Sequence, residues 1–165
     1  MRLEIIPVTE ANLSTFESLY QLYLYEYTDI MDWDVAADGR YVDNDFKDGF
    51  LAPDRYIFFA TVDKKLAGFA MVEDRSSQDL DFTIAMREFF VMRRFQRQGI
   101  GRQLALMLFD RFPGRWLVGQ LPKNARAIAF WRKVIGEYTG GNYAETTNED
   151  GDNLQYFDNR LKVGK

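Results

Sequence analysis

The chain has 165 residues, of which 47% are hydrophobic and 28% are charged, with a formal net charge of −4. This length and apolar content exclude a disordered polypeptide and predict one domain over residues 1–165. The acidic balance excludes general nucleic-acid binding, because that activity needs a basic face. The chain contains no cysteine and no histidine. This excludes disulfides, thiolate or imidazole metal sites and triads with a His base, and we expect no metal.

The N-terminal residues, MRLEIIPVTEANL, lack the apolar core of a signal peptide. No apolar run approaches the ~20 residues of a membrane span. We therefore expect a cytoplasmic protein without a membrane partner.

In chain order, residues 2–8 predict a first strand. Thr9 is a suitable helix cap, because apolar and aromatic residues recur after it every three or four positions. These are Leu13, Phe16, Tyr20, Tyr23, Tyr27 and Ile30. Residues 31–54 are acidic and aperiodic, which predicts a loop containing a short helix.

Two apolar runs, 55–62 and 66–75, flank Asp-Lys-Lys and predict a hairpin. Residues 82–92 predict a long central strand. A helical stripe follows, then Pro113-Gly114 and another strand at 115–121. The residues of the stripe are Ile100, Leu104, Ala105, Leu108, Phe109 and Phe112.

A second amphipathic helix starts near Asn124 and ends near Gly136. Segments 137–147 and 153–161 then flank a hairpin turn at Asp150-Gly151. The order β-α-β-β-β-α-β-α-β-β predicts a mixed α/β fold, with a parallel right-handed crossover over residues 82–121.

The junction between the central strand and its helix carries Gln96-x-x-Gly99-x-Gly101. Glycines let a backbone approach a ligand closely, and the first N–H groups of a helix attract anions. The junction is therefore suited to a pyrophosphate. It is not a P-loop, which needs Lys-Ser/Thr after the last glycine, and it is not a dinucleotide fingerprint, which needs glycine at Leu104.

A structural alternative is that the two glycines only make a tight turn. That alternative must also explain four arginines gathered here in an acidic chain, and we favour the anion site. The four are Arg93, Arg94, Arg97 and Arg102.

The segment EFFVMRRFQRQGIGRQLALMLFDRF (88–112) resembles the acetyl-CoA-binding segment of the GCN5-related N-acetyltransferases, the GNAT superfamily. NARAIAFWRKVIGEYT (124–139) is similar to the second signature of that family. The resemblance implies a GNAT-type fold with about seven strands flanked by helices.

By this resemblance, backbone N–H groups of the junction hold the pyrophosphate of acetyl-CoA, with Arg97 beside them. The donors are Gln98, Gly99, Ile100, Gly101 and Arg102. Main-chain groups of Phe90 and Val91 pair with the pantetheine arm, and Asn124 helps to hold it. The Val91 N–H polarises the thioester carbonyl, so Val91 is a catalytic position.

The chain departs from the family at Trp131, where a tyrosine often protonates the leaving thiolate. An indole is not a usable acid. Trp131 continues the apolar stripe of its helix, which favours a core position for the ring. The general acid stays open between Tyr138, Tyr143 and water.

A general base must deprotonate the attacking ammonium. Glu88 is the candidate nearest the end of the central strand, with an ordinary surface carboxylate as the alternative. Because the chain has no cysteine, the natural route is direct attack on acetyl-CoA rather than transfer through an acyl-cysteine.

The resemblance implies that acceptor specificity comes from the first helix, the loop after it and the last hairpin. The first helix and its loop are rich in aromatic and acidic residues, which favours a cationic amine. They are Tyr23, Tyr27 and Trp33 with Glu26, Asp29, Asp32 and Asp34. The alternative is that the tyrosines pack on the sheet and the carboxylates are solvated.

The sequence thus predicts an N-acetyltransferase that moves an acetyl group from acetyl-CoA to a primary amine of a small molecule or peptide. A catalytically silent acyl-CoA-binding module is the alternative. Whether the chain forms a homodimer stays open.

Overall fold

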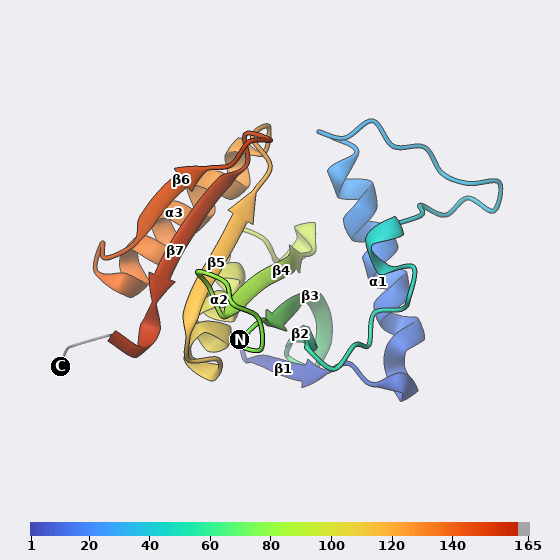
Figure 1. Ribbon diagram of the computed structural model, residues 1–165. Coiled ribbons are helices and arrows are strands. Elements are labelled where there is room, and N and C mark those ends of the chain that lie inside the picture. The colour runs from blue at the N-terminus through green and yellow to red at the C-terminus, as the bar shows by residue number, and fades with distance from the viewer. Residues whose placement is uncertain (162–165) are drawn as a thin grey trace.

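The computed structural model describes residues 1–161 and contains seven strands and three α-helices (Figure 1). The strands are β1 (Leu3–Pro7), β2 (Arg55–Val62), β3 (Lys65–Asp74), β4 (Ile84–Val91), β5 (Arg115–Gln120), β6 (Ala144–Thr147) and β7 (Asn153–Asp158). The helices are α1 (Leu13–Tyr27), α2 (Ile100–Arg111) and α3 (Ala125–Thr139), with short 3-10 turns at Glu10–Asn12, Asn44–Phe46, Arg93–Phe95 and Asn159–Leu161.

The strands form a single sheet in the order β1-β2-β3-β4-β5-β7-β6. β4 and β5 are parallel, and the other neighbours are antiparallel. α1 packs on one face of the sheet, whereas α2 and α3 pack on the other (Figure 1). The predicted mixed α/β fold with its parallel crossover is confirmed.

The sheet is open between its two central strands. β4 has eight residues, but only residues 84–86 pair with β5, at residues 116–118. The rest of β4 diverges from β5, which leaves backbone groups of residues 87–91 without a partner strand on that side. This divergence creates a slot in the middle of the sheet.

The approach of β3 to β4 depends on a glycine. A Cβ added to Gly68 would lie 1.9 Å from the carbonyl oxygen of Phe90, which no side chain can tolerate. The register of the two strands also shifts between Met71 and Val72, opposite Arg87. A bulge of this kind re-aims side chains along the strand that carries it.

Most predicted elements appear with ends shifted by one or two residues. The Asp63-Lys64 turn between β2 and β3 has a positive φ at both residues (48° and 66°), as a two-residue hairpin loop requires. Three predictions were wrong in detail. α1 ends at Tyr27 and does not reach Ile30. α3 continues past Gly136 to Thr139, with Gly140 (φ 62°) as its C-cap, and β6 is confined to four residues.

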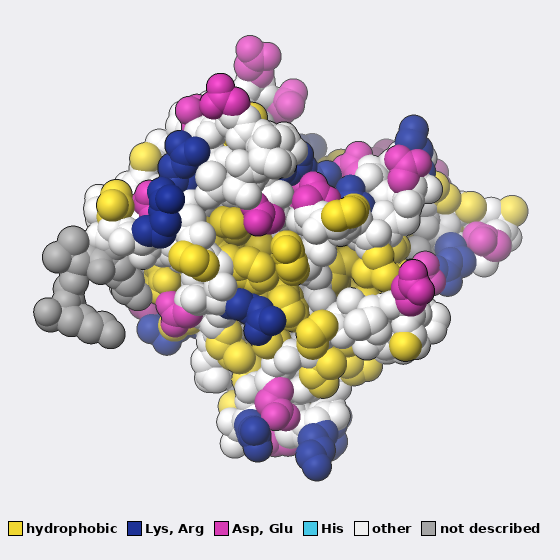
Figure 2. Space-filling model, turned by 60° about the horizontal axis from the view of Figure 1, so that its bottom comes forward, with side chains coloured by type: hydrophobic (Ala, Val, Ile, Leu, Met, Phe, Trp, Pro, Cys, Tyr) yellow, Lys and Arg dark blue, Asp and Glu magenta, His cyan; other side chains and the backbone are white. Residues whose placement is uncertain are grey.

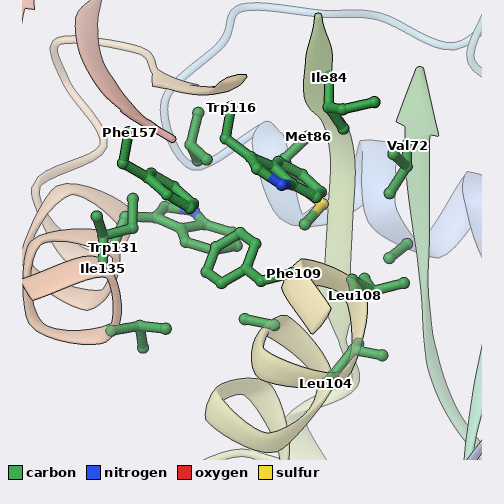
Figure 3. Close-up of a cluster of buried hydrophobic side chains, with 14 of the residues drawn as sticks. Val72, Ile84, Met86, Leu104, Leu108, Phe109, Trp116, Trp131, Ile135 and Phe157 are labelled. Carbon is green, nitrogen blue, oxygen red and sulfur yellow. The ribbon is translucent and has the colours of Figure 1, made fainter. Parts of the chain in front are cut away.

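The larger core lies between the sheet and the helices α2 and α3 (Figure 3). Trp131 of α3 is 5% exposed there, and its ring contacts those of Phe89 and Phe109 at 4.8 and 6.2 Å between centroids. Its predicted place in the core is confirmed. A second core, under α1, is built largely from aromatic rings, including Phe16, Tyr20 and Phe69.

The charged side chains do not gather by sign on the face that Figure 2 shows. Hydrophobic side chains occupy the middle of that face, and acidic and basic groups alternate around it (Figure 2).

None of the helices within residues 1–161 is long and apolar enough to cross a membrane.

Candidate active site

The glycine junction forms the N-terminus of α2, directly after the open part of β4. Gly99 caps the helix in the left-handed conformation (φ 78°), which glycine adopts at little cost. A Cβ at Gly101 would lie 3.3 Å from the Phe130 ring and 3.7 Å from Val91 Cγ2. The helix start, the end of β4 and α3 therefore meet closely here, and the free N–H groups of α2 point out of this junction.

The arginines around the junction differ in their surroundings. Arg93 pairs with Glu26 of α1 at 2.7 Å, and Arg102 pairs with Glu137 of α3 at 2.8 Å. The first ion pair therefore links the junction to α1, and the second links α2 to α3. We did not expect these structural roles from the sequence. Arg97 is exposed and has a left-handed backbone (φ 60°). Its contact with the pyrophosphate stays a prediction.

The end of β4 is fixed by two hydrogen bonds. Gln96 donates from Nε2 to the Val91 carbonyl at 2.7 Å, and the Met92 N–H donates to the Ala67 carbonyl of β3 at 2.8 Å. Peptide groups alternate in direction along a strand. The Met92 N–H points to β3, so the backbone N–H and C=O groups of Phe90 also point to β3. Those of Phe89 and Val91 point to the slot. The Phe90 ring is buried beside Tyr23 and Phe69.

Asn124 caps α3, because its side-chain oxygen accepts the Ala127 N–H at 3.1 Å. The residue thus has a structural role at the helix N-terminus. Its side-chain nitrogen is a separate donor, and a contact of that group with pantetheine stays a prediction.

Glu88 lies on the α1 face of β4 and is partly buried. Burial raises the pKa of its carboxyl group from 4.5 to about 7, while the Tyr23 hydrogen bond and the Arg87 charge act in the opposite direction. Tyr23 of α1 donates its hydroxyl to Glu88 Oε2. A carboxylate that titrates near neutral pH is well matched to general-base work.

A cleft of about 720 Å³ opens on this face, between α1, the 28–54 loop and the ends of β4, β5 and β7. Glu88 lies in its wall, and the other acidic groups come from separate segments of the chain. The six carboxylates that line the cleft are Asp32, Asp34, Asp43, Asp45, Glu88 and Asp152.

Arg87 is the basic residue of the cleft wall, and carboxylates already surround it: Asp45 at 3.5 Å and the buried Glu73 at 3.6 Å. Tyr27 and Trp33 stack at 6.1 Å between ring centroids and add an aromatic surface. Of the predicted acceptor residues, Tyr23, Tyr27, Trp33, Asp32 and Asp34 come together in this cleft. Glu26, which is bonded to Arg93, and Asp29 are not part of its wall.

Tyr138 is unsuited to act as the general acid. Its hydroxyl donates to Asp110 at 2.8 Å, and burial raises its pKa to about 12. Asp110 lies ten residues along α2 from Ile100, which corresponds to about 15 Å from the junction.

The sequence analysis named Tyr23 as a ring of the acceptor side and Gln96 as part of a motif, but it missed the roles of both. Tyr23 bonds to Glu88 and Gln96 bonds to Val91, and both bonds depend on tertiary contacts. The signal for Tyr23 was its spacing of three from Tyr20 and four from Tyr27, which places all three on one helix face.

This combination of a split sheet, a glycine-rich helix start beside the slot and a cleft across the sheet defines an acetyltransferase fold. The model of the acetyltransferase (GNAT) family matches residues 14–136. The chain belongs to this family, so it is an enzyme and the silent binding module is not supported.

Solved structures show the same fold at low sequence identity. An acetyltransferase from Thermus thermophilus is 16% identical, with a TM-score of 0.67 over 94% of this chain and 96% of that one. The ribosomal-protein-S18-alanine N-acetyltransferase from Escherichia coli is 17% identical, with a TM-score of 0.62 over 99% and 97%. PaiA N-acetyltransferase from Thermoplasma acidophilum, in complex with coenzyme A, is 12% identical, with a TM-score of 0.61 over 96% and 99%.

A sequence comparison with curated proteins finds no match. Within the described residues 1–161, no group of three or more acidic side chains is arranged to hold a metal ion.

Proposed function

We propose that the protein transfers the acetyl group of acetyl-CoA to a primary amine of a small molecule or peptide, by direct attack, and that the acceptor is cationic. The observation that carries this proposal is the position of Glu88. The residue lies where the acidic cleft on the α1 face meets the slot between β4 and β5. The acceptor and the thioester would therefore meet beside a carboxylate with a pKa near neutrality.

The residues of the junction fit acetyl-CoA. A pyrophosphate needs several N–H donors around an uncrowded backbone, and Gly99 and Gly101 stand where side chains would be strained or crowded. The proposed donors are the N–H groups of Gln98, Gly99, Ile100, Gly101 and Arg102, with the Arg97 guanidinium nearby.

The open edge of β4 suits the pantetheine arm, which carries two amides. The strand alternation leads us to expect the Phe89 and Val91 peptide groups, rather than Phe90, to contact this arm, with Asn124 near it. When bound, acetyl-CoA supplies the acetyl group as an activated thioester. The Val91 N–H would donate to the carbonyl oxygen of that group as negative charge develops on it.

The role of Glu88 is to remove a proton from the incoming ammonium group. The carboxyl is three residues from Val91 along a strand, which is ~10 Å, so we expect one bridging water rather than direct contact. No histidine is present to replace it. With Tyr138 held by Asp110, Tyr143 and water are the proposed sources of the proton for the leaving thiolate.

The preference for a cation follows from the charge of the cleft. Six carboxylates face one guanidinium that is itself bonded to carboxylates. Walls of one sign concentrate ligands of the opposite sign, and the exposed Trp33 ring adds a surface that attracts cations. One structural neighbour, 20% identical with a TM-score of 0.56, is an aminoglycoside acetyltransferase in complex with sisomicin.

A thiol-release assay with acetyl-CoA across a panel of amines tests the proposal. We expect turnover with diamines and amino sugars, and weaker turnover with zwitterionic amino acids. The double variant Asp32→Asn/Asp34→Asn should raise the KM of a diamine by about tenfold, since each solvent-exposed charge contact contributes ~1 kcal/mol or less.

The matched control is Asp38→Asn/Asp48→Asn, which removes the same charge from the same loop outside the cleft wall. It should leave the KM of the diamine close to that of the wild type. Turnover that favours anionic amines, or equal effects of the two double variants, would contradict a cationic acceptor.

A further inference from the structure

The hydrogen bonding of Glu88 is one-sided. Among residues 1–161, the hydrogen bond that the Glu88 carboxylate receives comes from Tyr23 and ends on Oε2. The residue also lies in the wall of the cleft. One carboxylate oxygen is therefore held by the protein, and Oε1 is left to meet a ligand or a water in the cleft.

The Tyr23 hydroxyl is itself held in place by packing. The side chain is 7% exposed. Its ring meets Tyr27 and Phe69 edge-on, at 4.8 and 5.4 Å between centroids, and Phe90 at 5.7 Å. Packing on three sides restricts the rotamers of the ring, so it holds the oxygen that contacts Glu88 in place.

We propose that Tyr23 is the positioning residue of the acetyl transfer, fixing Oε2 of Glu88 so that Oε1 accepts the proton from the acceptor amine. This inference rests on the proposed function of Glu88. The balance is simple: an N–H bond of the ammonium breaks, an O–H bond forms on Oε1, directly or through one water, and Tyr23 keeps its own proton. Glu88 then releases the proton to water.

Groups on three segments determine how Glu88 titrates. Arg87, its neighbour on β4, lowers the pKa of Glu88, and Asp43 and Asp45 of the 28–54 loop raise it. The Tyr23 hydrogen bond lowers it and opposes the effect of burial. From α1, Tyr20 and Tyr27 also face this carboxylate, and the pKa values of all three tyrosines are raised by burial. Each stays neutral, and Tyr23 remains a donor, throughout the neutral pH range.

Tyr23→Phe tests the inference, because it keeps the ring packing and removes the donor. The acid limb of the pH profile of kcat/KM for the amine should move to higher pH by about 1–2 units. A pKa shift of this size corresponds to the loss of one hydrogen bond to a charged group. At neutral pH this lowers turnover by about tenfold, and it leaves the KM for acetyl-CoA unchanged. The loss should disappear at high pH, where Glu88 is ionised in both proteins.

Tyr20→Phe is the matched control. Tyr20 is a buried tyrosine of the same helix that also donates to a carboxylate, but its partner is Asp43. Its variant should leave the acid limb in place. An unmoved limb in Tyr23→Phe, or an equal shift in both variants, would overturn the inference.

A second measurement does not depend on turnover. The pKa of Glu88, followed by ¹³C NMR of its carboxyl carbon with Glu88→Gln for assignment, should rise in Tyr23→Phe and stay unchanged in Tyr20→Phe. If Glu88→Gln keeps the wild-type pH profile, the proposed base is wrong. If Glu88→Gln loses activity but Tyr23→Phe shifts neither the limb nor the NMR titration, the positioning role alone is wrong.

Discussion

At the scale of single residues, the buried carboxylate of Glu88 serves the proposed reaction but destabilises the folded protein when it is ionised. Its folded-state pKa of about 7 lies above the ordinary value of 4.5. The folded state therefore binds the proton more tightly than the unfolded state does, and stability falls as pH rises from about 4.5 to about 7. Above that range the cost is constant.

Glu88→Gln should remove this cost, since the amide oxygen still accepts the Tyr23 hydroxyl. We expect the variant to be more stable than the wild type by roughly 1–3 kcal/mol near pH 8, with no gain near pH 4. Urea unfolding at the two pH values measures the difference. A gain that is the same at both would show that the charge of Glu88 is not its cause.

Trp131, in contrast, belongs to a family signature but stabilises the hydrophobic core. It contacts Phe89, Phe109 and Phe130 from inside the cluster of Figure 3. Trp131→Ala should cost about 3–5 kcal/mol of unfolding free energy, whereas Trp131→Tyr should be mild. A Trp131→Ala protein of normal stability with lost turnover would contradict the core role.

At the scale of elements, the sequence predicted strands and helices well because their periods are local. The stripe from Ile100 to Leu108 and the two runs of the β2–β3 hairpin reflect burial that repeats along one segment. The glycine junction was also predictable, because its chemistry needs neighbouring residues only. The end of α3 was misplaced, because Gly136 lies in the helix and the left-handed turn comes at Gly140.

What the sequence could not predict depends on contacts between distant elements. Gly68 looks like an ordinary strand residue, yet the Phe90 carbonyl occupies the space of its side chain. The pairing of Arg93 with Glu26 spans 67 positions. The bond from Tyr23 to Glu88 spans 65 positions, and no local pattern encodes it.

A pair of variants at Gly101 tests whether the N-terminus of α2 binds the pyrophosphate of acetyl-CoA. Acetyl-CoA should raise the Tm of the wild type, because a ligand that binds only the folded state stabilises it. Gly101→Ala and Gly101→Asp place the same Cβ near the Phe130 ring, but only the aspartate adds a charge beside the proposed pyrophosphate. The alanine variant should keep part of the Tm shift, and the aspartate variant should lose it.

The comparison of these two variants separates crowding from charge. Equal loss of the Tm shift in both would assign the role of Gly101 to packing. A full shift in a folded Gly101→Asp protein would contradict the position of the pyrophosphate.

At the scale of the whole molecule, the proposed coenzyme site and the proposed acceptor site lie on opposite faces of one sheet. The α2 and α3 face carries the junction and the larger core, and the α1 face carries the acidic cleft. The slot between β4 and β5 joins them, and Glu88 and Val91 sit along the strand that borders it. A proton acceptor and a thioester can then meet without either ligand crossing the core.

The pH dependence of kcat/KM for a diamine, in the wild type and in Glu88→Gln at saturating acetyl-CoA, tests the central claim most directly. The wild-type rate should rise as pH passes about 7, where Glu88 ionises. Glu88→Gln should keep its affinity for acetyl-CoA and lose roughly 10²-fold in turnover near neutral pH. That loss should shrink at higher pH, as more of the amine is already neutral. A pH profile that is the same in both proteins would contradict the account and leave Glu88 without a part in the chemistry.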